Sequence, residues 1–190
     1  MSVRLLKRRF TVEEYHRMAQ AGILSEDDRV ELIEGEIVEM VPIGSRHAAS
    51  VNRLTNLLSE LVGKRAIVSV QNPVRLGPYS EPQPDVALLR PRNDFYAPAH
   101  PGPKDALLVV EVTETSADYD REIKMALYAR AGVPEAWLVD LQEGVVEVHR
   151  SPSPDGYRGV QQHRPGQHLS PEAFPGLSLA VDAVLVDVRR

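Results

Sequence analysis

The sequence predicts an α/β (α+β) domain in which helices flank a central mixed β-sheet, with an N-terminal helix and β-hairpin before it. The order of segments supports this prediction, because a helix, a hairpin, a second helix, several strands, a third helix and further strands follow one another. The continuous apolar run Ala106 to Val112 is typical of a central strand that is covered on both faces. The 190 residues, 43% of them hydrophobic, can bury one core, and we expect a single domain over residues 1–190.

The N-terminal half contains clear start and stop signals. Residues 1–10 are expected to form a flexible, solvated arm. Thr11 and Glu14 match a capping box, which begins a helix that runs to about Ala19. Alternating apolar residues between Arg29 and Val41, with Gly35 at the turn, predict a β-hairpin. A second helix is expected over 47–62, and strands are expected over 66–76, with an interruption at Pro73, and over 85–89.

The C-terminal half begins with a long proline-rich connection over 91–104, which leads into the apolar strand. The next helix is expected to begin within 115–118 and to end at Gly132, with Ile123 and Leu127 on the stripe that faces the core. Strands are predicted over 136–141, 145–149 and 157–163, with turns at 143–144 and 151–156. Residues 177–188 are expected to close the sheet or to pack on it.

Composition excludes some classes of protein and leaves others open. The net charge of -5 does not indicate a basic nucleic-acid binder, although a local basic groove or a cluster of site carboxylates is compatible with it. The absence of cysteine excludes disulfides, thiolate zinc sites and cysteine nucleophiles. No apolar run approaches the ~20 residues of a membrane span, so we expect a cytoplasmic protein without membrane contact.

Two acidic residues stand beside strand-like apolar runs. Glu111 is the only charge within Leu107 to Val112, and strand alternation places it on the face opposite Val110. Asp85 follows Pro84 and precedes a second strand. Two carboxylates on neighbouring strands can share one hard divalent cation. The alternative is that Glu111 is a strand-end acid that reaches solvent or pairs with an arginine.

Lys124 lies on the helix that follows the Glu111 strand. A helix that folds back over the end of its preceding strand would bring this ammonium group to Glu111, where it could act on a water molecule or a phosphate. The alternative is an exposed pair with Asp120, one helical turn earlier. Glu31 lies on the hairpin face opposite Val30, and the pattern leaves open whether that face is solvent or a site.

Pro84-Asp85, Glu111 and a later lysine resemble the motif of the PD-(D/E)XK nuclease superfamily, which has a restriction-endonuclease-like core. More closely, the chain resembles the Uma-two family of restriction-endonuclease-like proteins from about Thr11 to Val181. In the superfamily motif, a lysine follows the second acid by two residues. In this chain Thr113 occupies that position, and Lys124 on the following helix takes the place of the lysine. The matching segments are 31–38, 83–85, 108–112, 119–124 and 128–140, and the block from 111 to 140 is the most specific.

The resemblance implies a metal-dependent endonuclease that hydrolyses phosphodiester bonds in DNA. Asp85 and Glu111 would hold Mg²⁺ or Mn²⁺, which activates water, and Lys124 would orient that water or stabilise charge on phosphorus. Glu31 and His47 are further candidates for the site, against the alternatives of an exposed hairpin acid and a polar residue at a helix start. Gln83 is a weaker candidate for lining the cleft.

The resemblance also implies a homodimer or higher homo-oligomer. Two alternatives to a DNA endonuclease remain open. One is a catalytically silent module that keeps the nuclease fold and binds nucleic acid or protein. The other is a metal-dependent hydrolase of a different phosphoester.

Overall fold

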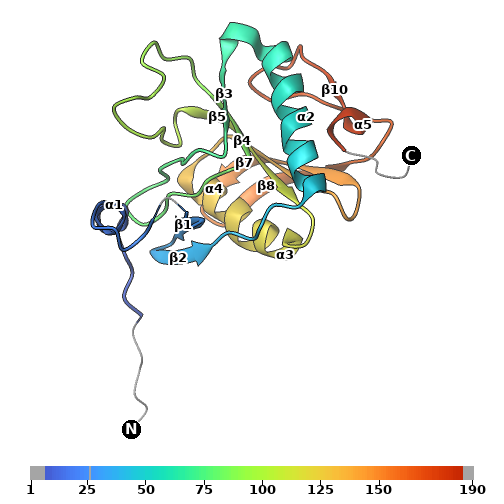
Figure 1. Cartoon of the computed structure of the whole chain (residues 1–190). Helices are drawn as coiled ribbons and strands as arrows, with labels where there is room; N and C mark the ends of the chain where they lie inside the picture. Colours follow the sequence, from blue (N-terminus) through green and yellow to red (C-terminus); the bar gives the residue numbers. More distant parts are fainter. Residues whose placement is uncertain (1–6, 26, 186–190) are drawn as a thin grey trace.

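A six-stranded mixed sheet forms the centre of the molecule (Figure 1). The computed structural model describes residues 7–25 and 27–185. The parallel pairing of β5 with β6 is flanked on both sides by antiparallel pairs, which confirms the predicted mixed sheet. In spatial order the strands are β3 (Ile67–Val70), β4 (Val86–Leu89), β5 (Ala106–Thr113), β6 (Glu135–Asp140), β7 (Val145–Ser153) and β8 (Gly156–His163).

Helices cover the two faces of this sheet, so β5 is buried along its whole length. One face packs against α2 (Ser45–Val62) and α5 (Val181–Val184). The other face packs against a helical segment composed of α3 (Ala117–Tyr119), a π-helix (Asp120–Lys124) and α4 (Met125–Ala131). Strand alternation sends Val110 to the α2 face and Val109 to the α4 face, as the sequence predicts.

The N-terminal helix and the hairpin form as predicted. In α1 (Val12–Gln20), the capping box is present, because the Glu14 amide donates to Thr11 Oγ1 over 3.2 Å and the Thr11 amide donates to Glu14 Oε2 over 3.0 Å. The hairpin of β1 (Val30–Ile33) and β2 (Glu36–Glu39) makes a separate two-stranded sheet. Its turn residue Gly35 has a φ of +83°, and a Cβ there would lie 2.5 Å from that of Arg9.

This close approach revises the expected arm over residues 1–10. Residues 1–6 lie outside the described part of the chain, whereas residues 7–10 are held against the hairpin. The Phe10 amide donates to the Gly35 carbonyl over 2.9 Å, and Lys7 pairs with Glu36 over 3.1 Å.

Three other boundaries differ from the prediction. The strand expected over 66–76 stops at Val70, because Gln71 has a φ of 50° and Pro73 cannot donate to a ladder. Strand β7 extends through Ser153, so the turn expected over 151–156 is shorter. Only a tight turn between Ser153 and Gly156 remains. Residues 177–185 pack on the core without joining the central sheet, since β10 (Leu179–Ala180) pairs with β9 (His168–Leu169) in a sheet of its own. Residues 186–188 of the expected segment lie outside the described part.

The π-helix corrects the predicted core stripe of the third helix. Ile123 lies within this π-helix and is 37% exposed, so it is not on the core stripe. Asp120 and Lys124 are buried instead. Leu127, beyond the π-helix, is buried as predicted.

Arg121 fastens the π-helix to the sheet. Its guanidinium contacts Glu147 on β7, with Nη2 3.0 Å from Oε1, and lies 3.5 Å from an oxygen of Asp140 on β6. Glu147 also accepts hydrogen bonds from His149 and Gln162. The His149 and Arg121 contacts outweigh burial and lower the pKa of Glu147 to about 2.

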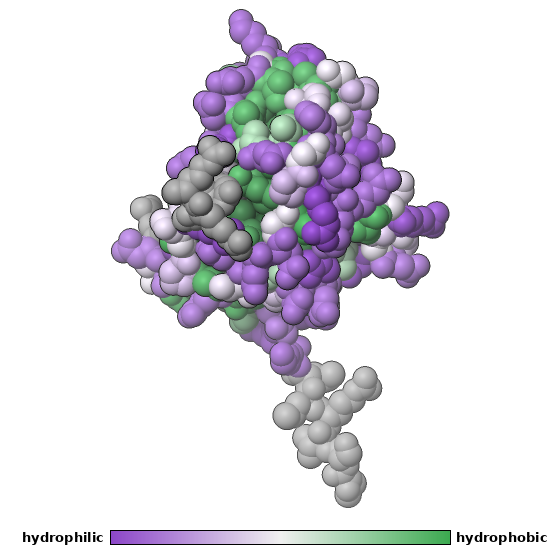
Figure 2. Space-filling view, turned by 90° about the vertical axis from the view of Figure 1, so that its right-hand side faces the viewer, coloured by the Kyte–Doolittle hydropathy of each residue, from purple (hydrophilic) through white to green (hydrophobic). Residues whose placement is uncertain are grey.

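The outer surface carries mainly hydrophilic residues around smaller hydrophobic areas on the face shown in Figure 2. Over residues 7–25 and 27–185, no helix has both the length and the apolar character that are needed to cross a bilayer.

We predict that Glu147→Gln destabilises the protein in a pH-dependent way. Because the pKa of Glu147 is lowered in the folded state, the carboxylate stabilises the fold above the ordinary glutamate pKa of 4.5, and this contribution is lost as the pH falls toward 2. The variant should lower the free energy of unfolding by about 2 kcal/mol at neutral pH and by much less near pH 2. Urea denaturation across this range measures the difference, with exposed Glu143→Gln on the same hairpin as the control. A penalty that does not change with pH would contradict the assignment.

Candidate active site

Acidic residues from three elements meet at one end of the sheet, beneath the hairpin. Glu111 projects from β5 toward the helical segment, and Asp85 directly precedes β4. Glu31 comes from β1, which lies outside the central sheet. All three side chains are almost fully buried, at 3% exposure for Glu31, 8% for Asp85 and 3% for Glu111.

Lys124 lies between two of these acids. Its Nζ is 3.2 Å from Glu31 Oε1 and 3.4 Å from both oxygens of Glu111. The predicted approach of Lys124 to Glu111 is therefore present, and the exposed alternative is wrong, because Lys124 is 7% exposed. The sequence pattern left open whether the hairpin face that carries Glu31 meets solvent or a site. In the structure, this face is turned toward Lys124.

His47 and Gln71 hold the Asp85 carboxylate. His47 lies in the first turn of α2, and its Nε2 is 3.0 Å from Asp85 Oδ2. The same oxygen accepts from the Val112 amide over 2.9 Å, and Gln71 Nε2 donates to Oδ1 over 3.2 Å. These contacts fix Asp85 beside the end of β5, next to Glu111.

Further hydrogen bonds hold the side chains of Glu111 and Glu31 in place. Tyr128 on α4 donates its hydroxyl hydrogen to Glu111 Oε1 over 2.6 Å. The Gln83 amide donates to Glu31 Oε2 over 3.1 Å, so Gln83 contributes through its backbone, and its side chain also lines the cleft.

Burial dominates the electrostatics of the site. Burial raises the pKa of Glu111 to about 8 against the opposing charge of Lys124. Burial also raises the pKa of Asp120, which accepts a hydrogen bond from Ser116. For Lys124, burial opposes the charge, but Glu111 and Glu31 outweigh it and raise the pKa. For His47, burial also opposes the charge, but the contacts with Asp85 outweigh burial and raise the pKa.

These groups line a cavity of about 590 Å³. All five residues that the sequence nominated line it, namely Glu31, His47, Asp85, Glu111 and Lys124. Two polar atoms at this cavity, His47 Nδ1 and Tyr119 Oη, are buried without a hydrogen-bond partner among the described residues. Unpartnered buried atoms of this kind are suited to a bound ligand or water.

The donor set fits a hard divalent cation. Glu31, Asp85, Glu111 and Asp120 supply carboxylate oxygens, the ligands that Mg²⁺ and Mn²⁺ prefer. Among the described residues that line the cavity, Lys124 is the one buried cationic group, and the half-buried His47 is the nearest other basic group to the acids. Four carboxyl groups thus face two basic groups, and a bound cation would compensate the excess negative charge.

Sequence reasoning missed three contributors to this site. Asp120 entered only as an exposed partner of Lys124, although its spacing four residues before a candidate lysine was a usable signal. Tyr128 follows Lys124 at the same spacing. Gln71 carries no signal, because its role depends on the end of β3 lying beside Asp85.

We predict that Lys124→Met destabilises the fold by about 3 kcal/mol, because it leaves buried carboxylates without their cation. Thermal and urea denaturation at neutral pH measure the effect. Lys104→Met, at an exposed lysine, is the control and should change stability by less than about 0.5 kcal/mol. Equal stability of the two variants would show that Lys124 does not balance the acids.

Comparisons with known proteins agree with this architecture. A solved structure titled as that of "a putative nuclease belonging to DUF820" from Anabaena variabilis superposes with a TM-score of 0.70. The two chains are 17% identical, and the alignment covers 92% of this chain and 97% of that one. At this identity the likeness shows a shared fold, which confirms the predicted core and flanking helices.

Family membership rests on a separate comparison. No curated protein matches the sequence. Residues 12–182 match the model of the Uma2 family, which is described as "Putative restriction endonuclease". This match spans most of the 190 residues and confirms the resemblance seen in the sequence. The chain therefore belongs to the Uma-two (Uma2) family.

Proposed function

We propose that this protein is a metal-dependent endonuclease that hydrolyses phosphodiester bonds in DNA. The observation that carries the proposal is the meeting of Asp85, Glu111 and Lys124 in one cavity, from two strands and a helix. Family membership supports a nuclease, as does the shared fold of a structure titled as a nuclease. Cleavage of both strands by a homo-oligomer is part of the proposal.

Asp85 and Glu111 are the proposed holders of Mg²⁺ or Mn²⁺, with Glu31 and Asp120 close enough to adjust the charge. The ion would supply Lewis acidity toward a phosphate oxygen and would lower the pKa of a bound water. His47 and Gln71 keep the Asp85 carboxylate in one orientation, and Tyr128 does so for Glu111. Such orienting contacts support the affinity and activity of a metal site.

Lys124 is the proposed electrostatic group. Its ammonium lies beside the acids and is fixed by the π-helix, so it need not reorganise when charge develops on phosphate. His47 also lines the cavity, and its Nδ1 is buried without a hydrogen-bond partner among the described residues. Arg29 is an exposed residue at the cavity and can contact a backbone phosphate of the substrate.

Cleavage by the purified protein tests the proposal on duplex, single-stranded and structured DNA, with Mg²⁺ or Mn²⁺. Asp85→Asn, Glu111→Gln and Lys124→Met should each lower the rate by at least about a hundred-fold. Glu122→Gln is the matched control, because this acid is exposed on the same helical segment. Circular dichroism and thermal melting verify that each variant is folded. Absence of cleavage in the wild type with either metal, or full activity in Asp85→Asn, would refute the proposal.

A catalytically silent nuclease-fold module is the second candidate function. The observation that favours it is that Lys124 and Tyr128 already satisfy both oxygens of Glu111. In such a module the acids and the lysine would form an internal ion-pair network, with nucleic acid or protein bound elsewhere.

Calorimetry with Mn²⁺ separates the two candidates. A metal site predicts binding heat that is lost in both Asp85→Asn and Glu111→Gln and retained in Glu122→Gln. A silent module predicts no binding heat that depends on Asp85 or Glu111. Either outcome stands independently of whether the correct DNA substrate has been found.

A further inference from the structure

A second cluster of potential metal ligands lies outside the cavity. His16 comes from α1, Glu81 from the segment beside β1, and His100 from the long connection between β4 and β5. Each residue offers one ligand atom, and these atoms all lie within 4.8 Å of one another. None of the three residues lines the cavity that holds Asp85 and Glu111.

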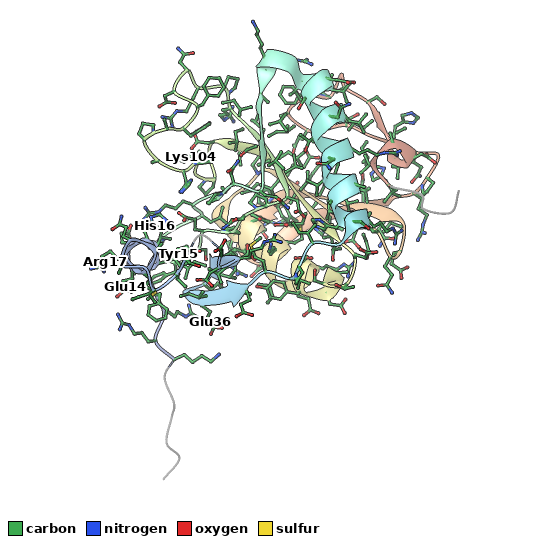
Figure 3. All side chains as sticks on the ribbon, in the orientation of Figure 1. Glu14, Tyr15, His16, Arg17, Glu36 and Lys104 are labelled. Carbon is green, nitrogen blue, oxygen red and sulfur yellow. The ribbon has the colours of Figure 1, made fainter. Side chains whose placement is uncertain are left out.

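The two histidines approach from separate segments. In Figure 3, His16 lies on α1, below the loop that carries Lys104. The His16 and His100 rings are edge to face, with centroids 6.1 Å apart. The loop is tethered next to His100, because the Arg75 amide donates to the Pro101 carbonyl over 2.9 Å.

Glu81 is the unusual member of the cluster. Its side chain is only 2% exposed, and Oε1 lies 2.6 Å from His16 Nε2. Its other oxygen, Oε2, is buried without a hydrogen-bond partner among residues 7–25 and 27–185. Within the same residues, no lysine or arginine pairs with this carboxylate. A buried carboxylate oxygen without a donor is costly, and a cation between the acid and the imidazoles would remove that cost.

We propose that His16, Glu81 and His100 bind a divalent transition-metal ion, with Zn²⁺ as the best fit. Two imidazoles and one carboxylate suit Zn²⁺, whereas Mg²⁺ prefers an all-oxygen shell. Three protein ligands leave a further position for water. The chemistry therefore differs from that of the carboxylate-rich cavity.

A bound metal ion would join three parts of the chain that are distant in sequence. The Glu81 amide donates to the Leu32 carbonyl over 2.8 Å, so the ligand is already anchored to β1. Gln83 and Asp85 follow within four residues of Glu81 and belong to the cavity. The bound ion would thus stabilise α1 and the loop that carries His100, and it would support the segment that carries Asp85.

Titration of the full, chelator-treated chain with ZnCl₂ tests the site by calorimetry, with the Zn²⁺-induced rise in melting temperature as a second readout. His16→Ala and His100→Ala should each weaken Zn²⁺ binding by at least about ten-fold and remove most of the thermal shift. Both side chains are partly or fully exposed, so the variants should fold. His168→Ala, at an exposed histidine elsewhere, is the control and should bind as the wild type does.

Asp85→Asn distinguishes this cluster from the cavity. We expect it to retain the Zn²⁺ event that His16→Ala and His100→Ala lose, and excess Mg²⁺ should not compete with that event. Zn²⁺ binding that is lost in Asp85→Asn but kept in both histidine variants would overturn the proposal. So would the absence of Zn²⁺ binding by the wild type. Neither result bears on DNA cleavage, which depends on the cavity.

Discussion

The burial of Lys124 between Glu31 and Glu111 is the interaction on which the rest of the site depends. Carboxylates in the interior are costly unless a positive charge or hydrogen-bond donors compensate them. Here one ammonium serves two acids from different sheets, so it also joins the hairpin to the central sheet. The hairpin is thereby held over the cavity that its own residues help to line.

Lys124 makes this contact from the π-helix. In a regular helix the stripe that carries Leu127 would carry Ile123 as well, and Lys124 would lie at the boundary of that stripe. In the π-helix, Ile123 is exposed and Asp120 and Lys124 are buried. Arg121, within the same turn, secures the segment to β6 and β7.

The two clusters of potential metal ligands differ in chemistry, although each takes one acid from the same short segment, Glu81 in one and Asp85 in the other. Asp85 is surrounded by donors from His47, Gln71 and the Val112 amide, and it faces other carboxylates. The carboxylate of Glu81, four residues earlier, has only the His16 imidazole as a side-chain partner within residues 7–25 and 27–185. An oxygen-rich cavity favours hard cations, and a histidine-rich cluster favours softer ones. The segment from 81 to 85 therefore connects both sites, and its backbone is paired with β1 through Glu81.

The sequence by itself determined the order and type of most elements, the central position of the strand that carries Glu111, and the family, but it left the burial of the Glu111 side chain open. Strand alternation, cap residues and an apolar run act locally, so each can be recognised from a few neighbouring residues. Only the tertiary structure decided that Glu31 and His47 reach the acids, that Ile123 is exposed, and that His16, Glu81 and His100 meet. The contacts join residues that are 19 to 93 positions apart in the sequence, and they leave no local pattern.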